Sequence, residues 1–363
     1  MAIEKNKTFG LEDIELVPAT ITSINHRSEC NVFNSDGMLP IFTAPMSTVV
    51  SIDNYTVFND YKVNTILPRN IAFKERLAHI NKTFVAMSLS EFSEFIDELS
   101  NNFSVENTYY VCIDLANGHM RSLLETCAKA KQMFGGNLII MTGNIANPKT
   151  YIEYAKCGID FVRVGIGGGS ACITSVQSGV HYGQASLIED CAKLKKQIEN
   201  TWADGNYQSI PYIVADGGFS NYGRIIKALA LGADYVMVGK MFAECEEACG
   251  PIFTMHKSHD KWSEEDKKHL LWDVSSGTYY VRLREYYGMS TKRAQKEFGS
   301  EKLKTSEGSE SWVYVQYTLS QMLDNLISYL RTAMSYTNSI DLEEFKNAEY
   351  NICSTNEFNA YNK

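Results

Sequence analysis

The sequence lacks several features that would each assign it to a broad class of proteins. No apolar run approaches the length of a membrane-spanning helix, and the first residues lack the apolar core of a signal peptide. We therefore expect a cytoplasmic protein with no membrane partner. No basic block is present either, and 34 Lys and Arg against 43 Asp and Glu leave a net charge of −9. This balance argues against a nucleic-acid partner, although a few local cations suffice to hold one phosphorylated small molecule.

The cysteines lack the paired spacing of a disulfide framework. There are nine of them, scattered through apolar segments, which favours reduced thiols. The closest approach to a metal pattern is Cys245 with Cys249, and His256 with His259, but no second cysteine pair accompanies it. The sequence therefore does not favour a structural zinc site. It also shows no internal repeat and no low-complexity linker.

What the sequence does contain is an alternation of strand-like and helix-like segments. A hydrophobic fraction of 44% and a charged fraction of 21% are those of a globular protein with a sizeable core. Eight short runs are apolar almost throughout, as in parallel strands covered on both faces: 41–44, 63–67, 83–87, 109–113, 137–141, 161–164, 211–215 and 234–238. Segments with helical periodicity separate most of them: 121–134, 150–156, 185–200 and 221–231. The pattern predicts an α/β fold, a (β/α)₈ TIM barrel, with a doubly wound open sheet as the alternative.

Polar and glycine residues gather directly after the later strands, where a barrel carries its catalytic face. Residues 114–119 follow the fourth strand and 142–144 the fifth. Residues 216–218 follow the seventh strand, and Gly239 with Lys240 follow the eighth. Together with a triple-glycine loop after the sixth strand, these turns are typical of the phosphate-binding corner of such barrels.

That glycine loop carries Cys172 and is the most informative segment of the chain. Three adjacent glycines (167–169) let the backbone bring N–H groups close to an anion, and Thr174 follows the thiol by two residues. A phosphate cradle, a nucleophile and a hydroxyl in one loop suggest covalent chemistry on a phosphorylated small molecule. Taken alone, the loop is equally consistent with a flexible turn followed by a buried cysteine.

We expect one barrel domain over residues 1–345 without an inserted domain. The more polar stretch within about 255–310 suits a mobile flap over the active site, with a charged, solvent-facing segment at 258–269. An amphipathic helix over 318–334 would close the barrel, and residues 346–363 would form a loose tail.

In this order and over residues 9–345, the motifs of the chain resemble those of the IMP dehydrogenase and GMP reductase family. The matching segments are 16–19, 44–49, 111–118, 143–144, the cysteine loop, 215–218, 227–233, 287–290 and 306–308. The resemblance implies a (β/α)₈ barrel that assembles as a homotetramer. The short interval between Met289 and Glu307 contains no Arg-Tyr pair, which is more similar to the reductase branch than to the dehydrogenases. There is also no room between 67 and 83 for the regulatory domains that many dehydrogenases carry.

The resemblance implies NADPH-dependent conversion of GMP to IMP and ammonia. Cys172 would be the nucleophile that attacks carbon 2 of the purine, and Thr174 with Glu307 would relay protons to the departing amino group. Apart from the resemblance, Thr174 is consistent with a strand-end hydroxyl and Glu307 with a solvated carboxylate. The resemblance also implies a monovalent cation such as K⁺ on the carbonyls of Gly167, Gly169 and Cys172.

The resemblance also assigns binding residues. The phosphate would be held by Ser170 and by amides of Gly217, Gly218, Gly239 and Lys240. Asp216 would bind the ribose hydroxyls, although an Asp before glycine also caps turns. The purine would lie against Met46, Met289 and Ser290. The cofactor and ribose would face Asp114, Asn117, Gly118 and Asn144.

Several positions depart from the reductase pattern, which leaves alternatives open. The departures are Ser47, residues 67–69, residues 175–177 and Lys304, where Arg is frequent. They put cofactor choice and the purine substituent in question. An IMP dehydrogenase lacking regulatory domains, a reductase of a related purine (deoxy)nucleotide, and a non-catalytic nucleotide-binding barrel remain alternatives.

Overall fold

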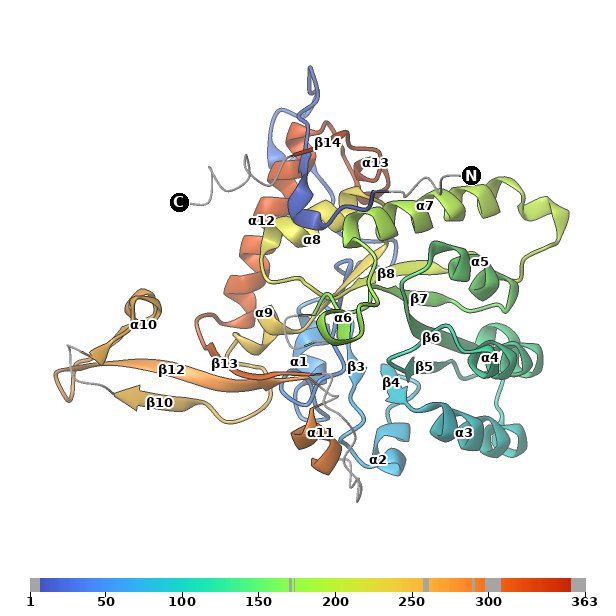
Figure 1. Ribbon diagram of the computed structural model, residues 1–363, viewed down its shortest axis with the longest axis horizontal. Helices are drawn as coiled ribbons and strands as arrows, with labels where there is room; N and C mark the ends of the chain where they lie inside the picture. The colour runs from blue at the N-terminus through green and yellow to red at the C-terminus, as the bar shows by residue number, and fades with distance from the viewer. Residues whose placement is uncertain are drawn as a thin grey trace.

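The computed structural model describes residues 7–169, 172, 174–256, 261–288, 291–297 and 308–353. Eight parallel strands form one sheet in the order β2-β9-β8-β7-β6-β5-β4-β3 (Figure 1). The sheet closes because the Asn64 amide donates to Ile41 O (3.0 Å) and Asn64 O accepts the Thr43 amide (2.9 Å). The strands are β2 Ile41–Thr43, β3 Ile66–Leu67, β4 Phe84–Met87, β5 Tyr109–Asp114, β6 Leu138–Ile145, β7 Phe161–Val164, β8 Tyr212–Asp216 and β9 Tyr235–Val238. All eight predicted strands and the predicted TIM barrel are confirmed, and closure excludes the open sheet.

Helices cover the outside of this barrel. Some of them start at residues whose side chains accept backbone N–H groups, for example Ser88 before α3 and Thr318 before α12. The helices are α1 Tyr55–Asp60, α2 Phe73–Leu77, α3 Leu89–Asn102, α4 Arg121–Phe134, α5 Pro148–Lys156, α6 Thr174–Ser178, α7 Gln184–Asn200, α8 Tyr222–Ala230, α9 Lys240–Ala243, α10 Glu264–Lys268, α11 Lys292–Glu297, α12 Leu319–Tyr336 and α13 Leu342–Phe345. In the described part of the chain, no helix combines the length and apolar character needed to cross a bilayer.

The amino-terminal end of the barrel interior is filled by aromatic rings. Phe42, Phe84 and Phe161 pack edge to face at centroid distances of 5.4–5.9 Å. Tyr235 lies 5.0 Å from Phe42, and Tyr212 lies 5.1 Å from Phe161. These rings come from the neighbouring strands β2, β9, β8 and β7 and from β4 across the barrel, so they close this end of the interior.

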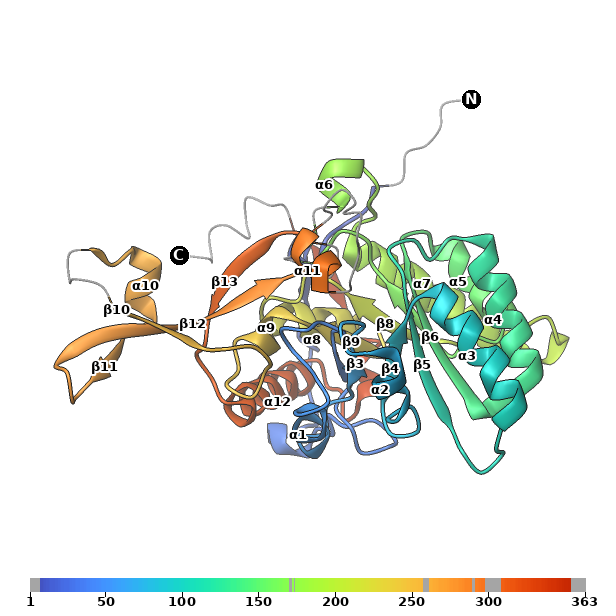
Figure 2. The same cartoon turned by 90° about the horizontal axis from the view of Figure 1, so that it is seen from below.

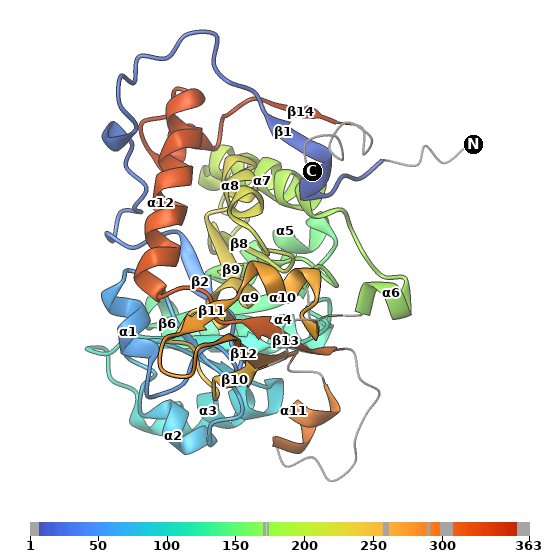
Figure 3. The same ribbon diagram turned by 90° about the vertical axis from the view of Figure 1, so that its left-hand side faces the viewer.

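A two-stranded antiparallel sheet lies outside the barrel beside α7 and α8 (Figure 3). It joins β1 (Ile14–Leu16) to β14 (Tyr350–Ile352), and the Cys353 amide donates to Asp13 O at 2.8 Å. The structure therefore differs here from the expected loose tail after residue 345. The sequence could not indicate this pairing, because a short edge strand depends on a partner at the opposite end of the chain. Residues 354–363 lie outside the described part.

An antiparallel sheet projects from the barrel as an arm (Figures 1 and 2). It contains β10 Phe253–His256, β11 Leu271–Asp273, β12 Thr278–Tyr287 and β13 Glu310–Tyr314. Its own core consists of Trp262, Val281 and Leu283. Part of the segment expected to face solvent is therefore packed, since Trp262 is only 7% exposed. The expected mobility of the flap remains a prediction.

Candidate active site

The carboxyl ends of strands β5, β7 and β8 deliver a buried ionic network to the barrel mouth. Asp114 ends β5, Arg163 lies in β7 and Asp216 ends β8. Arg163 points to the barrel interior because it is two residues after Phe161 on the same strand. Its Nη1 donates to Asp114 Oδ1 at 2.6 Å, while Nη2 and Nε donate to Asp216 Oδ2 at 2.8 and 3.1 Å. One guanidinium thus fixes both carboxylates.

The electrostatics of this network keep Arg163 charged. Burial alone would lower the pKa of its guanidinium, but the carboxylates of Asp216 and Asp114 raise that pKa well above the ordinary value. The side chain is 8% exposed. Arg163 is not among the site residues predicted from the sequence, although a charged side chain inside an otherwise apolar strand is a visible signal.

Asn144 in β6 joins the same network. Its Nδ2 donates to Asp216 Oδ2 at 2.7 Å and to Gly165 O at 2.8 Å. Its backbone oxygen accepts the Gly118 amide at 3.0 Å, and its own amide donates to Leu115 O at 3.3 Å. The predicted pair Asp216 and Asn144 is therefore brought into direct contact, and Asn144 links the β5, β6, β7 and β8 ends.

The predicted cofactor-side residues have different surroundings. Gly118 is buried, and a Cβ there would lie 2.7 Å from the Tyr154 hydroxyl and 2.8 Å from Asn144 O, so only glycine permits this approach. Asn117 is exposed, and its Oδ1 accepts the His119 amide at 3.0 Å. Asp114 is bound to Arg163. Asn117 therefore offers the most accessible polar group of the set, and the cofactor assignment stays a prediction.

The glycine loops after β7 and β8 pack directly on each other. A Cβ on Gly217 would lie 2.9 Å from the Gly169 amide nitrogen, and one on Gly218 would lie 2.9 Å from Gly168 O. Both Gly217 (φ +98°) and Gly218 (φ +84°) adopt left-handed conformations. Arg224 Nη1 donates to Gly218 O at 2.7 Å and holds the second loop in place. These backbones therefore form one glycine surface at the expected phosphate corner.

The end of β9 completes that corner. Gly239 precedes α9, and a Cβ there would lie 3.1 Å from Met46 Sδ, while the Tyr286 hydroxyl donates to Met46 Sδ at 3.7 Å. Lys240 starts α9, and its Nζ lies 3.8 Å from Glu244 Oε1. Burial raises the pKa of Glu244 to about 7, against the opposing effect of the Lys240 ammonium. Met46 and Gly239 are thus adjacent, as the predicted substrate site requires.

Cys172 lies at the same mouth with its predicted hydroxyl partner. Its thiol donates to Thr174 Oγ1 at 3.3 Å, and its amide donates to Gly169 O at 2.9 Å. The thiol-bearing residue is partly exposed, and its backbone forms an antiparallel bridge with Gly308. The position immediately before Gly308 is Glu307. Glu307, Ser170, Met289 and Ser290 all lie outside the described residues, so their roles stay predictions.

Burial raises the pKa of most of the other cysteine thiols. Burial raises the pKa of Cys112 and of Cys245 to about 12. Burial also raises the pKa of further thiols: Cys30, Cys127, Cys157, Cys191 and Cys249. The catalytic role of Cys172 stays a prediction.

Two of the three carbonyls predicted to bind a monovalent cation already have partners within the loop. Gly167 O accepts the Ser175 hydroxyl at 3.0 Å, and Gly169 O accepts the Cys172 amide at 2.9 Å. The cation site stays a prediction. Within the described ranges, no group of three or more His, Cys, Asp or Glu is arranged to hold a metal ion.

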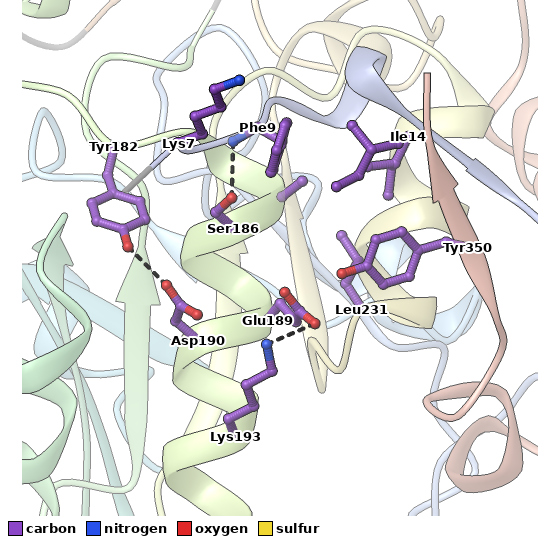
Figure 4. A pocket seen from close by; sticks show the side chains of 12 residues that line it. Lys7, Phe9, Ile14, Tyr182, Ser186, Glu189, Asp190, Lys193, Leu231 and Tyr350 are labelled. Carbon is purple, nitrogen blue, oxygen red and sulfur yellow. Dashed lines mark hydrogen bonds and ion pairs between the residues drawn. The ribbon is translucent and has the colours of Figure 1, made fainter. Parts of the chain in front are cut away.

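A cavity of about 380 Å³ lies elsewhere, between α7 and the β1–β14 pair (Figure 4). Its wall on α7 includes Ser186, Glu189 and Lys193, and none of the predicted site residues lines it. Glu189 is ion-paired with Lys193 at 2.9 Å. The cavity is therefore separate from the barrel mouth.

Comparisons with known proteins identify the family of the chain. A family model described as the IMP dehydrogenase / GMP reductase domain matches residues 10–359. A GMP reductase of Helicobacter pylori (strain J99) is 28% identical over 98% of this chain and 99% of its own length. GMP reductases of Oceanobacillus iheyensis and Enterococcus faecalis are each 27% identical, covering 97% and 98% of this chain and 98% and 99% of their own lengths. The similarity thus extends over the whole barrel and its arm.

Proposed function

Because the chain belongs to the IMP dehydrogenase/GMP reductase family, we propose that it is an oxidoreductase that converts GMP to IMP and ammonia with NADPH. The observation that carries the proposal is the Cys172 thiol, bonded to Thr174 at a mouth built from glycine loops. The relatives named GMP reductase support the choice of reaction.

The proposed chemistry begins with proton transfer from the Cys172 thiol. Thr174 Oγ1 already accepts the thiol hydrogen bond, so it is placed to pass that proton toward the departing amino group, with Glu307 as the expected further relay. A bond forms between Sγ and carbon 2 of the purine, and the bond from carbon 2 to the amino nitrogen breaks as ammonia leaves. NADPH, when bound, supplies the hydride for carbon 2. Sγ then departs with its bonding electrons, and IMP is released.

The remaining residues position the nucleotide. Asp216 Oδ2 receives the bonds from Arg163 and Asn144, so Oδ1 is the atom that we assign to the ribose hydroxyls. The left-handed turn at Gly217 and Gly218 brings the backbone close to the 5′-phosphate, with Gly239 and the Lys240 amide beside it. The charged Arg163 guanidinium holds the Asp216 carboxylate in one orientation, so the ribose meets a partner that is already in place.

Two further assignments belong to this proposal. The nicotinamide cofactor would lie along Asp114 and Asn117, which fit because Asn117 is exposed at the mouth beside the fixed carboxylate. A cytoplasmic homotetramer that binds K⁺ is proposed from the family resemblance, and no step above depends on it.

The test is a spectrophotometric screen of purified protein with GMP, dGMP or IMP against reduced and oxidised cofactors. We expect NADPH consumption with stoichiometric ammonia release in the presence of GMP. Oxidation of IMP by NAD without any turnover of guanine nucleotides would reassign the protein as a dehydrogenase. Turnover of dGMP in preference to GMP would identify a divergent reductase.

Replacement of the nucleophile separates an enzyme from a binding protein. Cys172→Ala should lower kcat by at least about 10³-fold, as for removal of a covalent nucleophile, and leave GMP binding measurable by calorimetry. Equal behaviour of the parent and Cys172→Ala, both binding GMP without turnover, would support a non-catalytic barrel.

A further inference from the structure

The ring of His119 bridges two loops at the barrel mouth. His119 follows β5, and its Nε2 accepts the backbone N–H of Ala146, which follows β6, at 3.1 Å. Its Nδ1 lies 2.9 Å from the Thr150 hydroxyl in α5. The residue is exposed to solvent, yet both ring nitrogens have partners.

These bonds define the protonation state of the ring. A backbone N–H can only donate, so Nε2 must carry a lone pair when it accepts from Ala146. The neutral ring then carries its hydrogen on Nδ1 and donates it to Thr150 Oγ1. In a doubly protonated ring, Nε2–H and the Ala146 N–H would face each other as two donors, and the contact would be lost.

The His119–Ala146 hydrogen bond is close to the network around Asp216, to which we assign the orientation of the nucleotide. Ala146 is two residues after Asn144, whose side chain donates to Asp216 Oδ2 at 2.7 Å. On the His119 side, the Gly118 amide donates to Asn144 O, and the Tyr154 hydroxyl donates to Gly118 O at 2.7 Å. Ala146 therefore lies on the same segment as Asn144, and Gly118, next to His119, contacts that segment directly.

We propose that His119 is a positioning residue that holds Asn144 against Asp216, and that it does so only in its neutral form. The ring acts through backbone atoms and touches no expected substrate group. Acidification would release Ala146, loosen the segment at 144–146 and weaken the ribose contact of Asp216. The inference rests on the proposed function for its kinetic readout alone.

The surroundings of the ring favour the neutral form at pH 7. Desolvation lowers the pKa of His119, and it is the one cause of that shift. In the elements around the ring, the charged residues nearest to His119 or Thr150 along the chain are Asp114 at the end of β5, Arg121 at the start of α4 and Lys149 in α5. Asp114 is ion-paired with Arg163, and Arg121 and Lys149 are exposed.

Two substitutions separate positioning from mere packing. The amide oxygen of a glutamine can accept from Ala146 where Nε2 now does, and it has no titrating proton, so His119→Gln should keep the KM for GMP within about twofold at pH 8. It should also abolish the rise in KM that we expect of the parent on acidification. His119→Ala should raise the KM for GMP about tenfold at pH 8, the effect of one lost hydrogen bond, with a smaller change in kcat. At low pH its KM should match that of the parent, because protonation of His119 has removed the same bond there. His26→Gln, beside the outer 3-10 helix η2 (Arg27–Glu29), is the matched control and should match the parent.

A second measurement does not depend on turnover. In the parent, hydrogen exchange of the Ala146 amide should accelerate as the ring titrates, and ¹⁵N shifts at pH 8 should show hydrogen on Nδ1 and none on Nε2. Identical KM profiles for His119→Gln and His119→Ala, or Ala146 exchange that ignores ring titration, would overturn the inference. Absence of turnover with any nucleotide, together with the expected exchange and shifts, would defeat the proposed function and leave the positioning role of His119 standing.

Discussion

The barrel interior is aromatic at one end and ionic at the other, and on β7 the two ends are only two residues apart. On β7, Phe161 points into the aromatic cluster, and Arg163, two residues later, points into the carboxylates of Asp114 and Asp216. The aromatic end gains stability from burial of large apolar rings. The ionic end gains little net stability, since desolvation of the charges offsets their attraction. Its ion pairs instead fix the orientation of the two carboxylates. One strand thus serves stability at its start and function at its end.

The largest effect on this comparison is expected from Arg163→Met. It leaves two partly buried carboxylates facing each other without their shared cation, which should cost about 3–5 kcal/mol of folding free energy. The misplaced Asp216 should lower kcat/KM for GMP by about 10². Urea denaturation and steady-state kinetics measure the two effects. Arg163→Lys retains the charge without the planar fork and should fall between; a kcat/KM of Arg163→Met within about threefold of the parent would show that the ionic end is dispensable.

Phe42→Ala tests the opposite end. Phe42 is 2% exposed and contacts three other rings, so its removal should cost about 3–5 kcal/mol in urea denaturation. The KM for GMP should stay unchanged in the folded fraction, because the rings lie away from the mouth. Phe42→Leu, which retains most of the volume, should cost about 1 kcal/mol. A raised KM in either variant would mean that the two ends are coupled.

Glu244→Gln tests the effect of a buried carboxyl at the phosphate corner on the pH dependence of stability. Because the folded pKa of about 7 lies above the ordinary value of 4.5, the folded state binds the proton more tightly than the unfolded state. The resulting stability is present below pH 4.5 and is lost as the pH rises through 7. Glu244→Gln should therefore be more stable than the parent by about 2–3 kcal/mol at pH 8 and equal to it at pH 4. The exposed Glu94→Gln is the control without burial, and a parallel offset of Glu244→Gln at both pH values would refute the burial of Glu244 as its cause.

The smallest effect is expected from Cys112→Ala, directly beneath the ionic end. Its Sγ lies 3.9 Å from Arg163 Nη1, and burial holds its thiol protonated. Loss of one sulfur atom should cost about 1 kcal/mol and leave turnover within about twofold. Under native conditions, iodoacetamide should label Cys172 and spare Cys112, as mass spectrometry would show. Labelling of Cys112 in the folded protein would mean that the ionic end opens to solvent.

Much of the barrel could be predicted from the sequence, because local residue patterns indicate its strands and helices. Each strand is a short apolar run, and α4 begins and ends at the predicted residues 121 and 134. Cys172, Thr174 and Asp216 were accessible because their motif spacing is itself local. By contrast, the pairing of Arg163 with Asp114 joins residues 49 apart, and no local pattern specifies which buried charge meets which.

Neither the arm nor the His119–Ala146 hydrogen bond could be predicted from the sequence, for a related reason. In β12, the buried Val281 and Leu283 alternate with the more exposed Tyr280 and Arg282, which indicates a strand. The strands β10 and β11 are short and mostly exposed, which is also typical of loops. His119 accepts from a backbone amide 27 residues away, and a backbone donor leaves no trace in the residue types.

The antiparallel bridge between Cys172 and Gly308 connects the backbone of the cysteine loop to the chain that leads into the arm. β13 starts two residues after Gly308 and pairs with β12 along five residues, so the outer sheet and the nucleophile are joined through one stretch of main chain. The main chain between Gly308 and β13 therefore ties the position of the arm to the backbone of Cys172.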